Sequence, residues 1–163
     1  MNPMNPTEKQ LERVTQLLRE QTTLSLATTG EDGMPSVAPL FYFADENLTL
    51  YWLSSPASLH SRNLMRSPRA ATNIYRNALS WREIRGVQII GSVCVIAEPK
   101  LRATILERYC QRFHLGRVLK VAVRQSVLHA LQPEFIRYID NSSGFKSKFE
   151  WMRTQQGWTP ASL

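Results

Sequence analysis

Three short strand patterns with brief turns between them fill residues 21–53 and limit what this chain can fold into. Residues 21–28 alternate in polarity, as a half-buried strand does. The glycines of 29–33 permit the positive φ that a tight turn needs, and an apolar strand is expected over 35–43. A third strand, over 48–53, is expected to pair with the second. Consecutive antiparallel strands at this spacing predict a meander or a barrel.

The rest of the chain adds helices and further strands. Helices are predicted over 7–20, 59–66, 99–113 and 117–130, the last of them stopped by Pro133, and strands over 70–75, 84–97, 135–140 and 145–152. Within the long strand, Gly91 is interpreted as a bend at a barrel corner, and Gly86 as either a bend or a close approach to a ligand.

No repeat or linker divides the sequence, so a single domain over 1–163 is predicted, with loose tails at 1–6 and 154–163. Hydrophobic residues make up 43% of the chain, which suffices for an ordinary globular core. No apolar run approaches the roughly 18 residues of a membrane span, and the N-terminus lacks a secretory pattern. We therefore expect a cytoplasmic protein with no membrane partner.

The net charge of +7 attracts anions, so nucleic acid has to be weighed as a partner. The arginines are dispersed, however, and no nucleic-acid-binding motif appears, so this partner is not expected. A phosphate-bearing small ligand or a solvated basic surface explains the charge as well. Cys94 and Cys110 lack metal-ligand spacing, so we predict no metal site, and both are expected to be buried and free.

A serine-rich corner follows the third strand and leads into a short helix at Ser58. The unpaired N–H groups and the dipole of a helix N-terminus favour an anion, so a phosphate could bind there. The alternative is a plain N-cap and turn, which is the commoner use of such a serine. The residues alone favour the N-cap.

Three stretches together resemble the pyridoxamine 5′-phosphate oxidase-like family of FMN-binding proteins. Residues 33–43 resemble its Gly-x-Pro…Pro…Phe opening, 58–69 its Ser-Arg-Lys-x-x-Asn-Leu…Pro-Arg helix, and 85–91 its Arg-Gln-Val-x-x-x-Gly strand. Each match is weak alone, but their order and spacing are those of the family. The resemblance implies a mainly β fold with flanking helices, a split barrel of six or seven antiparallel strands.

The resemblance also implies FMN at a homodimer interface, with a small-molecule substrate or electron donor as the further partner. It places Val37, Ala38 and Pro39 along the isoalloxazine ring, Ser54 and Ser58 at the phosphate, Gly86 and Gln88 near the ring or ribityl chain, and Trp151 or Arg153 in reach from the other subunit.

The chain departs from the family pattern at the phosphate, where most FMN-binding members have Arg and Lys and this sequence has Leu59 and His60. A phosphate dianion prefers fixed positive charge with bidentate donors, and a histidine is only partly charged near neutral pH. We therefore weigh His60 equally as a phosphate ligand and as an ordinary surface residue. Arg62 or Arg85 is the alternative source of charge.

The main functional hypothesis is an FMN-dependent oxidoreductase of unknown substrate, in which the cofactor carries the hydride chemistry. The alternative keeps the fold as a non-catalytic module that binds or stores a flavin, haem or another tetrapyrrole, with His60 or His114 as candidate iron ligands. A basic interaction protein without a cofactor is the third hypothesis. No catalytic residue is assigned, because no nucleophile elbow, triad or spaced carboxylate pair is found.

Overall fold

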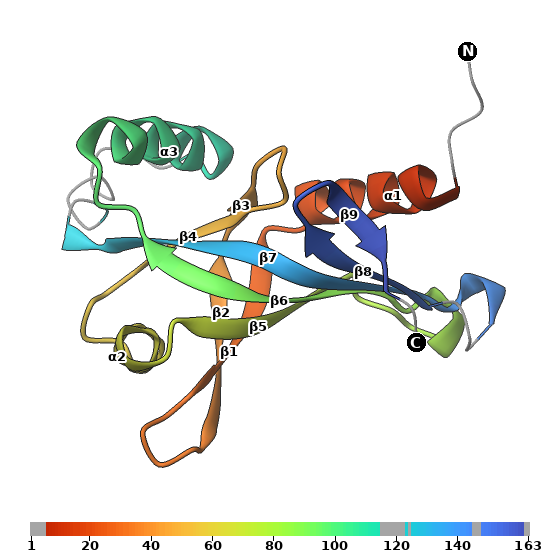
Figure 1. Cartoon of the computed structure of the whole chain (residues 1–163), viewed down its shortest axis with the longest axis horizontal. Coiled ribbons are helices and arrows are strands. Elements are labelled where there is room, and N and C mark those ends of the chain that lie inside the picture. The colour runs from red at the N-terminus through yellow and green to blue at the C-terminus, as the bar shows by residue number, and fades with distance from the viewer. Residues whose placement is uncertain (1–5, 115–122, 124, 145–147, 162–163) are drawn as a thin grey trace.

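The computed structural model describes residues 6–114, 123, 125–144 and 148–161. In these parts the chain forms one antiparallel sheet of nine strands with three α-helices and two 3₁₀ turns (Figure 1). The elements are α1 (Pro6–Glu20), β1 (Thr23–Thr29), β2 (Pro35–Phe41), β3 (Phe43–Ala44), β4 (Leu50–Ser54), α2 (Leu59–Arg66), β5 (Arg69–Tyr75), η1 (Trp81–Glu83), β6 (Arg85–Val95), α3 (Pro99–Arg112), β7 (Val127–Asp140), η2 (Asn141–Ser143), β8 (Lys148–Thr154) and β9 (Gly157–Pro160). The predicted mainly β fold with flanking helices is confirmed.

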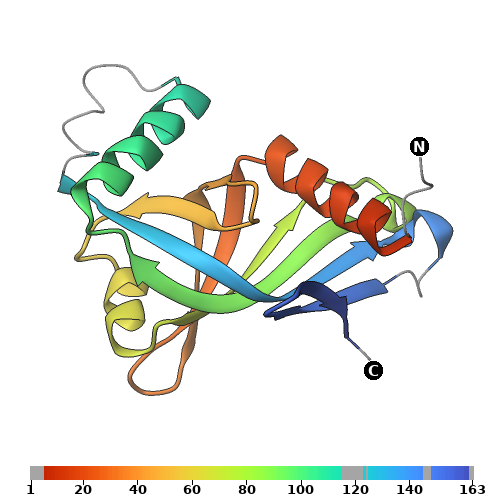
Figure 2. The same ribbon diagram turned by 45° about the horizontal axis from the view of Figure 1, so that its top comes forward.

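The strand order explains why the sheet curls. The order is β2-β1-β5-β6-β7-β4-β3, with β8 beside β7 and β9 beside β8. The two edge strands of this path, β2 and β3, are consecutive in the chain and are separated only by Tyr42. The sheet must therefore bend until its edges approach each other, which gives an open barrel (Figures 1 and 2). Tyr42 is buried, and its hydroxyl donates to the carbonyl oxygen of Leu18 on α1 at 2.9 Å.

The main core lies between α1 and the concave side of the sheet (Figure 2). Val14, Leu17 and Leu18 recur at helical spacing, and all three are buried. A smaller cluster lies at the other end, where Ile105 and Tyr109 of α3 pack against Phe43 and Leu128. The two clusters hold α1 and α3 in place against the sheet.

The prediction of a helix through residue 130 is wrong at its C-terminal end, because Val127–Asp140 form one long strand. This strand pairs with β4 on one side and β6 on the other. The earlier part of the predicted helix falls largely outside the described residues. Pro133 does not stop a helix; it pairs with Gly91, beside the shift in register between β6 and β7. Such an irregularity is where an inner strand tolerates a proline.

Three smaller expectations also need correction. The predicted hairpin between 35–43 and 48–53 is confined to β3 and β4, because β2 pairs with β1 instead. The predicted loose C-terminal tail contains β9, which pairs with β8, and Trp158 packs against the core. Cys94 is exposed rather than buried, because β6 alternates and it is Val93 that faces the core.

Candidate ligand-binding site

An apolar row crosses six strands on the outward face of the sheet. Direct register partners place its members side by side: Val37, Ala27, Ala71, Ile90, Phe135 and Met152, on β2, β1, β5, β6, β7 and β8. Val37 is 68% exposed, Met152 45% and Ile90 42%. Apolar side chains that lie together on an exposed face in this way mark a binding surface more often than scattered ones do.

A polar row runs beside the apolar row, and on each strand it lies two residues away from the apolar member. Its members are Ser25, Asn73, Gln88, Arg137 and Glu150, and Pro39 lies at its β2 end beside Ser25. Arg137 Nη1 donates to Gln88 Oε1 at 3.3 Å, and Arg137 Nε pairs with Glu150. Because its oxygen is engaged by Arg137, the Gln88 amide presents its NH₂ group as a donor.

The two rows meet in a shallow hollow of about 340 Å³, lined by Ala27, Val37, Asn73, Gln88 and Ile90 among others. Its β2 wall belongs to an edge strand, which has only β1 as a partner among the described strands. An edge strand keeps a row of backbone N–H and C=O groups available to a ligand. Of the three β2 candidates, Val37 and Pro39 face this hollow side, while Ala38 pairs with Leu26 and shares its inward face.

The predicted serine–histidine corner exists, and comprises Ser54, Ser58, His60 and Ser61. His60 Nε2 lies 2.7 Å from Ser54 Oγ and 3.1 Å from Ser58 Oγ, and Ser58 Oγ lies 2.8 Å from Ser61 Oγ. Ser58 is the N-cap of α2, as its sequence position predicts, and its side chain accepts from the Ser61 amide. The hydroxyls of this corner therefore bind one another and the imidazole.

Burial lowers the pKa of His60, so its ring is mostly neutral at pH 7. His60 interacts electrostatically with His129. The pKa of His129 is lowered to about 4, chiefly by burial and secondarily by His60. The His129 ring stacks on Trp52 at 5.3 Å between centroids, and its Nδ1 atom is buried without a hydrogen-bond partner among the described residues. The corner is therefore a neutral hydrogen-bonding site rather than a cationic one.

The two predicted arginines differ in position, because Arg62 follows Ser61 of the corner on α2 whereas Arg85 lies far from it. Arg62 lines a cavity of about 820 Å³ with Glu31 and Asp32. Arg85 pairs with Asp140 at the far end of β7, about 40 Å of strand away from Val127, the partner of Ser54.

Two further predicted residues are buried. Gly86 lies two register rows beyond the polar row, where it pairs with Tyr75. Trp151 is 1% exposed and belongs to the main core, so its side chain presents no surface to a partner.

These positions decide how well FMN fits. The sheet face suits its ring, since an apolar surface lies beside hydrogen-bond donors. The corner suits its phosphate poorly, because neither Leu59 nor neutral His60 supplies fixed charge there, Arg62 lines a cavity that it shares with Glu31 and Asp32, and Arg85 pairs with Asp140. The described residues contain no group of three or more metal-ligating side chains, and none of their helices is long and apolar enough to cross a membrane.

A family model described as pyridoxamine 5′-phosphate oxidase matches residues 11–154. The chain belongs to the pyridoxamine 5′-phosphate oxidase family. The resemblance inferred from the three sequence motifs is thereby confirmed. A UPF0306 protein of Cronobacter sakazakii is 32% identical over 120 residues, which cover 73% of this chain and 79% of that protein.

Two solved structures share the family fold. A pyridoxamine 5′-phosphate oxidase-related, FMN-binding protein of Nostoc punctiforme has a TM-score of 0.73 at 13% identity, covering 98% of this chain and 97% of its own. HutZ, the haem storage protein of Vibrio cholerae, has a TM-score of 0.65 at 21% identity, covering 78% and 89%. At these identities the likeness establishes the split-barrel fold alone. An FMN-binding protein and a haem storage protein share this fold.

Residues that sequence reasoning missed complete the site. Asn73, Arg137 and Glu150 join Gln88 in the polar row, and His129 joins His60 near the corner. In the sequence, the alternation of a strand shows only that each of these side chains faces one side of the sheet or the other. Only the register between strands distant in sequence shows which of them are neighbours.

Proposed function

We propose that this protein binds a flavin on the outward sheet face, between two copies of the chain, and uses it in oxidation and reduction. The observation that supports this most is the apolar row lying directly beside the polar row on an exposed sheet face. A flat heteroaromatic ring needs apolar support for its faces and a few placed polar groups at its edge. Gln88 and Asn73, side by side in the polar row, supply such groups.

A second copy of the chain is part of the proposal, because the hollow is shallow. Ligand sites bury most of a ligand's surface, and an open hollow of about 340 Å³ on one sheet cannot do that alone. The apolar row continues past the hollow to Phe135 and Met152, so a partner has apolar surface on which to dock. A homodimer would cover both the row and the ring.

The neutral corner limits how much the flavin phosphate contributes to the binding affinity. Without fixed charge, Ser54, Ser58 and His60 offer a phosphate only neutral hydrogen bonds, which are roughly half as strong as charge-assisted ones. The proposal therefore expects the ring to provide most of the affinity. When bound, a flavin supplies hydride and electron transfer, while the chain holds and orients it.

The experiment is a titration with FMN, riboflavin and haemin in parallel, followed by visible absorption. We expect FMN and riboflavin to bind with affinities within about threefold of each other, since the phosphate adds little. Ile90→Glu places a carboxylate in the apolar row and should weaken both by more than about tenfold. Leu101→Glu on α3 is the control, because Leu101 is 47% exposed and lies outside both rows. Absence of flavin uptake by the unmodified protein would refute the proposal.

A non-catalytic binding or storage module is the second candidate. Arg137 and Glu150 are the ionisable side chains of the two rows, and they pair with each other. This pairing leaves neither of them free to act as an acid or a base on a substrate, which favours the binding module. Oxidation of NAD(P)H by the flavin-loaded protein would support the oxidoreductase, and its absence the binding module. Uptake of haemin without flavin would move the assignment to a tetrapyrrole.

A further inference from the structure

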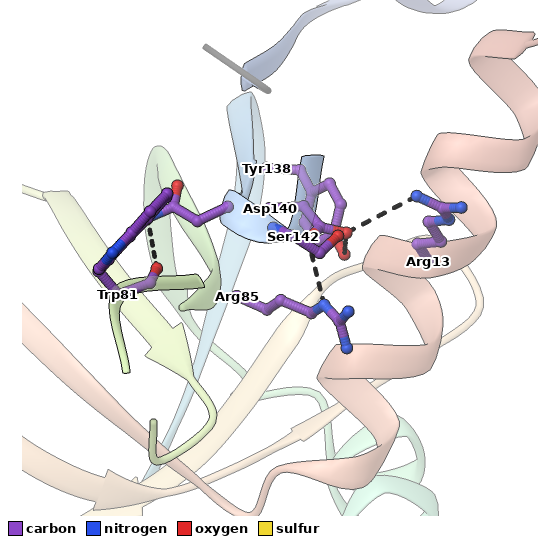
Figure 3. Close-up of polar contacts among 7 residues, drawn as sticks. Arg13, Trp81, Arg85, Tyr138, Asp140 and Ser142 are labelled. Atoms are coloured by element: carbon purple, nitrogen blue, oxygen red, sulfur yellow. Dashed lines mark hydrogen bonds and ion pairs between the residues drawn. The ribbon is translucent and has the colours of Figure 1, made fainter. Parts of the chain in front are cut away.

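A polar pocket of about 310 Å³ lies at the end of the sheet under α1, and it is lined by Arg13, Gln16, Leu17, Arg76, Arg85, Tyr138, Asp140 and Ser142. These residues come from α1, the chain after β5, the start of β6, the end of β7 and η2. Figure 3 shows Arg13 and Arg85 converging on Asp140 from two of these elements. We call this site the arginine pocket.

The carboxylate of Asp140 is already satisfied by the protein. Its residue is 6% exposed, and it accepts from Arg85 Nε at 3.2 Å and from the Ser142 amide at 3.0 Å, while Arg13 Nη1 lies 3.7 Å away. Burial opposes ionisation, but the hydrogen bonds from Ser142 and Arg85 outweigh it and lower the pKa of Asp140. Asp140 is therefore a charged group that fixes the arginines rather than one that seeks a further cation.

The arginines retain donors and charge beyond what Asp140 uses. Arg85 reaches Asp140 through Nε, and its terminal nitrogens point toward α1 in Figure 3. Arg13 is half exposed, and Arg76 pairs with Glu20 at the pocket wall. Among the described residues, three guanidinium groups thus face two carboxylates, Asp140 and Glu20, which leaves one positive charge in excess.

The pocket is separate from the sheet-face site. Arg85 projects from β6 on the same side as buried Val87 and Ile89, which is the side that α1 covers. Gln88 and Ile90 project from the opposite side. The sheet itself therefore lies between the two sites, and a ligand in one does not compete with a ligand in the other.

We propose that the arginine pocket binds a small molecule through an oxyanion group, a phosphate or a carboxylate. Guanidinium groups present planar pairs of N–H donors that match both groups, and here they are pre-positioned by a buried aspartate. The surplus charge selects for an anion. Gln16 and Ser142, which also line the pocket, add neutral polar atoms for the body of the ligand.

The test follows the Ser142 backbone amide by NMR while inorganic phosphate, or separately acetate, is added to the full chain. A saturable shift with phosphate or with acetate is expected, and the ion that binds more tightly identifies the preferred oxyanion. Arg13→Gln should weaken binding by about fivefold or more, since it removes a charged donor. Arg13 is chosen because Arg85→Gln would leave Asp140 buried without its closest cation.

Arg69→Gln is the matched control, because Arg69 is a similarly exposed arginine that pairs with Glu134 away from the pocket. It removes the same charge from the whole molecule and should leave the affinity nearly unchanged. Arg76→Gln is a second variant that should weaken binding in the same way as Arg13→Gln. No saturable shift with either ion, or equal weakening by Arg69→Gln, would overturn the proposal. Neither result bears on flavin binding.

Discussion

Two glycines of β6 differ sharply in how much space surrounds them. A Cβ on Gly91 would lie 2.0 Å from the carbonyl oxygen of Gln132, whereas a Cβ on Gly86 would first meet Tyr75 Cβ at 3.3 Å. Gly91→Ala should therefore lower the free energy of unfolding by about 3 kcal/mol or more, because backbone has to move. Gly86→Ala should cost less than about 1 kcal/mol. Urea unfolding measures both, and equal losses would contradict this account.

The role of Gly91 could be predicted only in part. A glycine inside an apolar strand indicates a bend or a close approach, and the bend at Gly91 was readable from residues 84–97 alone. Its partner was not, because Pro133 is about forty residues further along the chain and resembles a helix stop.

His129 makes stability depend on pH. The pKa of its ring is about 4 in the folded chain, against 6.5 without the fold, because burial disfavours the charged form. Its neutral form is the stabilising one, so this contribution is complete above pH 6.5 and is lost as pH falls towards 4. The loss should amount to about 3 kcal/mol.

The variant His129→Phe keeps the stacking on Trp52 and removes the titration. Its free energy of unfolding should change less between about pH 7 and pH 4.5 than that of the unmodified chain. Chemical denaturation at the two pH values measures the difference. Identical pH profiles for both proteins would show that His129 does not carry this dependence.

At the scale of elements, the start of α2 depends on one hydroxyl. Ser58 caps the helix by accepting from the Ser61 amide, and it also contacts His60. Ser58→Ala should lower the free energy of unfolding by about 1 kcal/mol. Ser80 precedes η1 but makes no capping hydrogen bond with its side chain, so Ser80→Ala is a matched control with little expected effect. A loss as large in Ser80→Ala would argue against a specific cap.

Elements with local signals were predicted well, and elements that depend on distant partners were not. Leu11, Val14 and Leu17 mark α1 by spacing, and Ser58 marks the start of α2. The apolar run at the start of β7, in contrast, suits a helix as well as a buried strand. Pairing with β4 and β6 on both sides decides for the strand, and no local pattern reports that pairing.

At the scale of the whole molecule, the candidate site is assembled by register across the sheet. Val37, Pro39 and Gln88 were expected together, and the pairing through β1 and β5 puts them on one face. Arg85 was weighed as a source of charge for the phosphate corner, but it pairs with Asp140 at the other end of β7. The length of β7 separates Arg85 from the corner, and this length cannot be read from sequence spacing.

Sedimentation velocity followed at the flavin absorption band tests the central claim most directly, because it reports ligand and partner together. The account predicts that flavin sediments with a dimer of the unmodified chain and of Leu101→Glu. Ile90→Glu, with a charge in the apolar row, should sediment as a monomer and leave the flavin behind. Flavin that travels with a monomer, or a dimer that persists in Ile90→Glu, would contradict a site built between two copies on this face.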